Sequence, residues 1–135
     1  MIIVRQRITL VKIQRPQKPT VNDELKWLGL SLGLFGERDR DKSCYRLFLE
    51  LLKAAKAQQL VSSDDLAERV GLSRGTIVHH LTRLRHAGIV LVEGKKYILR
   101  ENTLEILIDD IKRDMDHACE EMKEAAKEID EMLGL

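Results

Sequence analysis

The sequence has few aromatic residues, few cysteines and no long apolar run. Its 135 residues include one Trp, two Tyr and two Phe, so the core must be largely aliphatic, which suits helices packed on helices. The two cysteines, Cys44 and Cys119, exclude a disulfide framework or a cysteine metal cage, and a reducing cytoplasm is the expected compartment. No apolar run approaches the roughly 18 residues that span a bilayer, so we expect no membrane partner.

The N-terminal residues MIIVRQRITLVKIQ lack the long apolar segment and the small-residue cleavage site of a signal peptide. Residues 2–13 are rich in Ile, Val and Thr, and several apolar residues share one parity, which predicts a strand. The two prolines of QRPQKPT then predict a linker. Residues 1–20 also carry five bases and no acid.

Charge is distributed unevenly, although the formal net charge is only +1. Residues 101–135 carry twelve acids and four bases, a net of −8, whereas residues 1–100 carry nineteen bases and ten acids, a net of +9. Residues 69–100 hold seven bases against Glu93 alone. This polarity favours a polyanion partner at the basic part of the chain. Uneven surface charge without a function is the alternative.

The central part of the chain has the predicted order helix, helix, tight turn, helix, hairpin. Apolar residues recur at helical spacing in CYRLFLELLKAAKAQQ. SSDDLAERV begins with a serine cap and two acids, and Gly71 ends this helix. Ser73 caps a further helix that runs to about Ala87, where Gly88 stops it. The runs IVLV and YILR, joined by EGKK, predict a β-hairpin, and the helices around Gly71 have the length and connection of a helix-turn-helix.

The helix that follows Ser73 has one apolar side and one polar side. With Ile77 taken as the inward direction, Leu81 and Leu84 fall within about 40° of it at 100° per residue. The outward side carries glycine, hydroxyls, imidazoles and a guanidinium: Gly75, Thr76, His79, Thr82, Arg83 and His86. It contains no acid and no large aliphatic residue.

The residue types of this outward side match the chemistry of a DNA major groove. Arg83 can bind guanine edges, Thr76 a phosphate or a thymine methyl group, and Gly75 lets the backbone approach closely. Ser73 and the free N–H groups at the helix start can hold a phosphate. An acid would repel the phosphates, which explains why Gly71–Val90 has three arginines, three histidines and neither Asp nor Glu. An ordinary solvated helix face is the alternative.

The segment DLAERVGLSRGTIVHHLTRLRHAGIVLVEGKKYIL, residues 65–99, resembles the winged helix-turn-helix of bacterial and archaeal transcription regulators, above all the arsenical-resistance repressor (ArsR) type. The resemblance implies that Ser73 to His86 is the recognition helix. It also implies that Glu93 to Lys96 is the tip of the wing, where Lys95 and Lys96 touch the DNA backbone or minor groove. Winged helices also serve as protein-interaction modules, and such a module is the main alternative function.

The chain from Thr103 to Leu133 has the pattern of one long helix. Nine residues follow each other in steps of four and three without a break: Leu104, Ile108, Ile111, Met115, Ala118, Met122, Ala125, Ile129 and Met132. This heptad seam predicts a coiled coil and therefore a homodimer. An intramolecular hairpin against the helix of residues 42–58 is the alternative. A dimer would present two recognition helices to half-sites about one turn of DNA apart.

A metal-responsive repressor is a third possibility, because some ArsR-type proteins sense metals. Asp116, His117, Cys119 and Glu120 cluster on the long helix, but the paired cysteines near the helix-turn-helix and a second histidine on the terminal helix are missing. No metal site is therefore predicted, and Cys119 is expected to be a small buried residue beside the seam. His80 flanks an apolar side and is expected to be a half-buried structural histidine. No spacing suggests catalysis, so we do not expect an enzyme.

The sequence thus predicts a mainly α protein with a small β-hairpin wing. Its parts are a basic strand and linker over residues 1–20, a winged helix-turn-helix domain over residues 21–100 and a dimerisation helix over residues 101–135. The predicted function is a homodimeric, sequence-specific transcription regulator on double-stranded DNA, without a cofactor and with any effector left open. The residues predicted to contact DNA are Ser73, Arg74, Gly75, Thr76, His79, Arg83, His86, Lys95 and Lys96.

Overall fold

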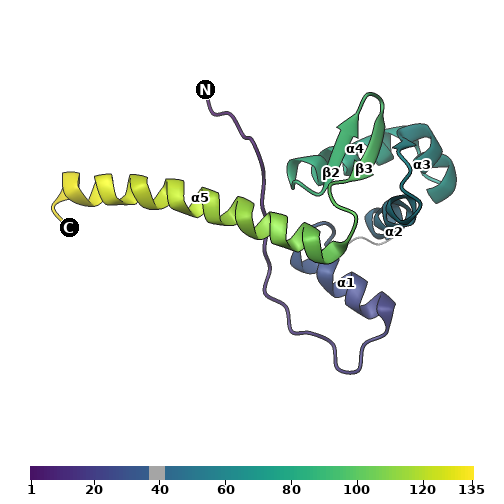
Figure 1. Ribbon diagram of the computed structural model, residues 1–135, viewed down its shortest axis with the longest axis horizontal. Coiled ribbons are helices and arrows are strands. Elements are labelled where there is room, and N and C mark those ends of the chain that lie inside the picture. Colours follow the sequence, from purple (N-terminus) through teal and green to yellow (C-terminus); the bar gives the residue numbers. More distant parts are fainter. Residues whose placement is uncertain (37–41) are drawn as a thin grey trace. The chain divides into compact units, whose positions relative to one another are not determined.

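The computed structural model describes residues 1–36 and 42–135, in two compact units, Met1–Asn102 and Thr103–Leu135. The elements of the first unit are α1 (Val21–Ser31), α2 (Ser43–Lys56), β1 (Val61–Ser62), α3 (Ser63–Val70), α4 (Arg74–His86), β2 (Val90–Glu93) and β3 (Lys96–Leu99). The second unit is one helix, α5 (Leu104–Leu133) (Figure 1). The predicted fold class, a winged helix-turn-helix with a long C-terminal helix, is confirmed.

Short polar residues and glycine set the ends of the helices. The side-chain oxygens of Thr20, Ser62, Ser73 and Thr103 each accept a hydrogen bond from the backbone N–H three residues later, at the starts of α1, α3, α4 and α5. Gly71 ends α3 in the left-handed conformation, with φ of 74°, which glycine adopts without a steric penalty. The serine and glycine signals around the helix-turn-helix therefore predicted its boundaries correctly.

The wing belongs to a sheet of three strands. β2 and β3 form the predicted hairpin, with Val90 opposite Leu99 and Glu93 opposite Lys96. β1 adds to the other edge of β3, so that the order is β1-β3-β2 and all pairs are antiparallel. The sequence did not predict β1, because two residues are too few to show an alternating pattern. This short strand ties the connection between α2 and α3 to the wing.

The core of the first unit contains one side of each of α2, α3 and α4. Phe48 of α2, Leu66 of α3 and Leu81 of α4 are completely buried. Burial of one such side chain contributes roughly 1.5–3 kcal/mol to stability. Beyond these, Phe35 and Tyr45 form an edge-to-face pair with ring centroids 5.5 Å apart. The core is otherwise aliphatic, in keeping with the scarcity of aromatic residues.

Residues 2–13, called the N-terminal arm below, form no strand, and that prediction is wrong. The backbone N–H of Arg7 donates to the carbonyl oxygen of His86 at 2.8 Å, and that of Val11 donates to the carbonyl oxygen of Ser31 at 2.8 Å. Both acceptors lie at the C-terminal ends of helices. The arm is therefore held by single hydrogen bonds to carbonyl groups at helix ends and not by the hydrogen-bond ladder of a neighbouring strand. The composition of the arm does not distinguish these two modes of attachment.

Helix α5 runs without interruption over 30 residues. Along the predicted seam Ile111 is buried, Leu104 and Met115 are half-buried, and six residues are exposed: Ile108, Ala118, Met122, Ala125, Ile129 and Met132. Cys119 is exposed as well, so its predicted burial is wrong. Every residue from 116 to 135 is exposed, so nothing within the second unit itself covers this part of the seam.

Candidate nucleic-acid interface

Helices α3 and α4 are joined by a three-residue turn, Gly71–Ser73. The backbone N–H of Gly71 donates to the carbonyl oxygen of Ala67 at 2.9 Å. Arg46 of α2 donates from Nη1 to the carbonyl oxygen of Val70 at 2.9 Å. Carbonyl groups at the end of a helix have no partner within the helix, and these two bonds supply one. The end of α3, where the turn begins, is thereby held in place.

Helix α4 has a buried side and an exposed side, as its spacing predicted. Ile77 and Leu81 are completely buried and Leu84 is 1% exposed. Thr76 is half-buried, and the other residues predicted to face outward are exposed: Gly75, His79, Thr82, Arg83 and His86. The packing of three aliphatic side chains therefore directs the acid-free side of α4 to solvent.

His80 lies on the buried side of α4 and is 9% exposed. Its Nε2 lies 2.9 Å from the hydroxyl of Ser43, the first residue of α2. This contact joins the start of α2 to the middle of α4. His80 therefore supports the fold, as predicted, and does not belong to the exposed side.

The start of α4 is prepared by Ser73, whose Oγ accepts from the N–H of Thr76 at 3.2 Å and lies 2.9 Å from the Thr76 hydroxyl. The first-turn N–H groups carry the positive end of the helix dipole. A side chain at Gly75 would meet no atom within 4 Å, so the backbone is open to a ligand there. Arg74 lies 3.4 Å from Asp64, but both side chains are 72% exposed, and such surface pairs are weak.

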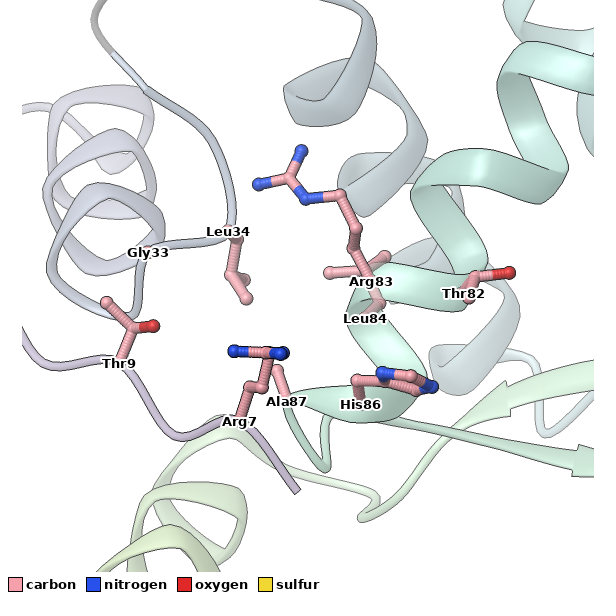
Figure 2. Close-up of a pocket in the computed structure, with 9 residues that line it drawn as sticks. All are labelled: Arg7, Thr9, Gly33, Leu34, Thr82, Arg83, Leu84, His86 and Ala87. Carbon is pink, nitrogen blue, oxygen red and sulfur yellow. The ribbon is translucent and has the colours of Figure 1, made fainter. Parts of the chain in front are cut away.

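The end of α4 borders a pocket of about 240 Å³. Its lining comes from the N-terminal arm, the turn after α1 and the last turns of α4: Arg7, Thr9, Gly33, Leu34, Thr82, Arg83, Leu84, His86 and Ala87. Figure 2 shows Arg7 on the arm and Arg83 on α4 lining this space from two different segments. Sequence reasoning missed the part played by the arm, because no periodicity relates two segments so far apart in the chain.

The wing is short. Gly94, with φ of 64°, and Lys95 form the turn between Glu93 and Lys96. Lys95 and Lys96 are both exposed. The two lysines that the resemblance assigns to DNA therefore lie at the tip of the hairpin and next to one acid.

Residues 49–91 match the model of the family described as "Bacterial regulatory protein, arsR family". The match runs from the middle of α2 into β2 and contains the whole of α3, α4 and their turn. The chain carries an ArsR-like helix-turn-helix. This domain supports a DNA-binding transcription regulator as the class of function. No curated protein and no solved structure matches the chain.

In residues 1–36 and 42–135, no three His, Cys, Asp or Glu side chains come together as a metal ion would require. Among the described residues, no third side chain therefore joins His117 and Cys119 to hold a metal ion. Within the same ranges, no helix combines the length and the apolar character that crossing a membrane demands.

Replacement of Ser73 separates its role in stability from a role in binding. Ser73→Ala removes the cap of α4 and should lower the free energy of unfolding by about 1 kcal/mol. Ser73→Asp retains a capping acceptor, so its stability should stay within about 0.5 kcal/mol of the wild type. At a phosphate, however, the aspartate adds repulsion, and affinity for duplex DNA should fall further with Asp than with Ala. Urea unfolding and anisotropy of a labelled duplex measure both; equal affinities of the two variants would contradict a phosphate at this helix start.

Proposed function

We propose that the protein is a homodimeric transcription regulator that binds specific sequences of double-stranded DNA through α4. The observation that carries the proposal is the outward side of α4, which is exposed, free of acid and fixed by the burial of Ile77, Leu81 and Leu84. A DNA major groove admits an α-helix and presents hydrogen-bonding base edges to it. In a helix-turn-helix the second helix occupies this groove, and that helix is α4.

The proposed contacts divide into those that position the protein and those that read the sequence. Backbone contacts are assigned to the two ends of α4 and to the wing, through Ser73, Arg74, His86, Lys95 and Lys96. Base-edge contacts are assigned to the middle of the exposed side, through Thr76 and His79, with Gly75 allowing close approach. Arg83 lies nearer the end of α4 and is assigned to readout or positioning. Lysine and arginine contacts to phosphate supply most of the sequence-independent affinity through the release of counterions.

Arg83→Glu tests this assignment most simply. The change replaces a cation on the outward side with an anion, and we expect the affinity for a duplex to fall roughly a hundredfold, since loss of one charged contact costs about 1–3 kcal/mol before repulsion is added. Lys53→Glu is the matched control, because it makes the same change of charge on α2, where the Lys53 side chain is 73% exposed. Fluorescence anisotropy of a labelled duplex measures both variants.

The outcome also separates the two classes of function. A winged helix that docks only onto protein would tolerate Arg83→Glu as well as Lys53→Glu. Equal affinities of the two variants for DNA would therefore contradict the proposed role of α4. A wild type that does not bind DNA at low salt would favour a protein partner.

The dimer is proposed to form through the C-terminal half of α5. Met122, Ile129 and Met132 are 61%, 48% and 77% exposed, although their spacing places them on one stripe of the helix. An isolated helix in water is only marginally stable, and a second copy would cover the stripe by knobs-into-holes packing. A dimer would also double the number of recognition helices on one DNA site.

Met122→Lys places a charge in the seam and should convert a dimer into a monomer. Glu120→Gln is the control, because it also raises the net charge by one but lies about 200° around the helix from position 122. Sedimentation equilibrium should give twice the chain mass of 15.5 kDa for the wild type and the control, and the single chain mass for Met122→Lys. A monomeric wild type at micromolar concentration would contradict dimerisation through α5.

A further inference from the structure

The N-terminal arm is attached to the end of the recognition helix. The backbone N–H of Arg7 donates to the carbonyl oxygen of His86 at 2.8 Å, and Nε2 of Gln6 donates to that of Ala87 at 3.2 Å. These carbonyl groups belong to the end of α4, where no N–H group within the helix is left to donate to them. The arm thus caps the C-terminal end of α4, and the hydrogen bond to His86 holds the Arg7 backbone against this helix.

Two glycines with positive φ make room for the arm. A side chain at Gly88, whose φ is 81°, would approach Gln6 Nε2 to 2.3 Å. A side chain at Gly33, whose φ is 67°, would approach Thr9 Cγ2 to 2.5 Å. The arm therefore crosses the end of α4 and the turn after α1 at the two places where the neighbouring residue has no side chain. Between these crossings lies Arg7.

The pocket beside this crossing is cationic. Arg7 and Arg83 are its charged residues and His86 also lines it; among the residues that the structure describes, its lining contains no acid. Within the described part of the chain, neither guanidinium group forms an ion pair. Two of the three chain segments that line the pocket, residues 1–20 and Gly71–Val90, are free of Asp and Glu in the sequence. Two like charges that share one space repel each other, and an anion between them removes that repulsion.

We infer that this pocket binds a phosphate group between Arg7 and Arg83. The phosphate comes either from the backbone of bound DNA, a source that rests on the proposed function, or from a phosphorylated small molecule, a source that does not. Arginine forms paired hydrogen bonds with phosphate oxygens. Figure 2 shows the Thr9 hydroxyl directed into the same space, where it can donate to a further oxygen.

The size of the pocket agrees with a small anion. Its volume of about 240 Å³ lies below the roughly 300–1,000 Å³ of pockets that enclose drug-sized ligands. The hydroxyl of Thr82 donates to the carbonyl oxygen of Val78 at 2.8 Å, so its proton is already used and is not assigned to the anion. Recognition of the anion therefore depends on the two arginines and on Thr9.

The first arm of the test uses duplex DNA and the full chain. Arg7→Gln should weaken binding about tenfold, as the loss of one charged hydrogen bond predicts. It should also make the log–log salt slope shallower by about 1, equally for different sequences. Arg5→Gln removes the same charge two residues away, outside the pocket lining, and should change binding by less than about twofold. Because the Arg7 side chain is exposed and its backbone holds the arm, the variant should fold, which circular dichroism checks.

The second arm of the test uses inorganic phosphate without DNA. Phosphate should raise the melting temperature of the wild type and of Arg5→Gln, because it binds the folded state. It should not raise the melting temperature of Arg7→Gln or Arg83→Gln. The reference is a sulfate-free chloride buffer at equal ionic strength. An effect of Arg7→Gln on DNA alone assigns the pocket to a backbone phosphate. An effect on inorganic phosphate alone assigns it to a phosphorylated small molecule.

The inference is overturned if Arg7→Gln and Arg5→Gln behave alike in both arms. Failure of the proposed function is a separate result. In that case the wild type does not bind duplex DNA even at low salt, and the response to inorganic phosphate alone decides whether the pocket takes a phosphate group.

Discussion

The burial of Ile77, Leu81 and Leu84 fixes the rotation of α4 about its own axis. A rotation that brought these side chains to solvent would lose roughly 1.5–3 kcal/mol for each of them, whereas the rest of the helix offers the core one large apolar side chain, Val78, which is 38% exposed. The cap at Ser73 and the bond from Arg46 to the end of α3 then fix where α4 begins. The acid-free side of α4 is exposed because of this packing, since its residues are those that do not pack into the core.

The N-terminal arm extends that surface beyond the helix-turn-helix. Its bonds to His86 and Ala87 satisfy the end of α4 and place Arg7 in the lining of the same pocket as Arg83. The lack of acid in residues 1–20 and the lack of acid in Gly71–Val90 thus belong to one place in the fold. The negative charge of the chain lies instead in α5, which carries most of the acids of residues 101–135. The division of charge along the sequence is also a division between elements.

The sequence predicted what depends on local chemistry. Ser73 and Gly71 marked the ends of α3 and α4, and the spacing of Ile77, Leu81 and Leu84 gave the buried side of α4. What depends on distant partners was missed: β1 exists only through its pairing with β3, and the arm resembles a strand because its composition does not show that helix ends receive it. The expected burial of Cys119 was wrong because it assumed a covered seam, whereas a single chain leaves that part of α5 exposed.

The central claim is that the protein binds duplex DNA by neutralising several phosphates, and the salt dependence of duplex binding tests it most directly. Anisotropy with a random duplex of about 30 base pairs should give a plot of log affinity against log salt with a slope of about −4 or steeper, since each neutralised phosphate contributes about −0.9. A slope near zero, or no binding at low salt, would contradict the claim. The basic surface would then serve a partner other than DNA.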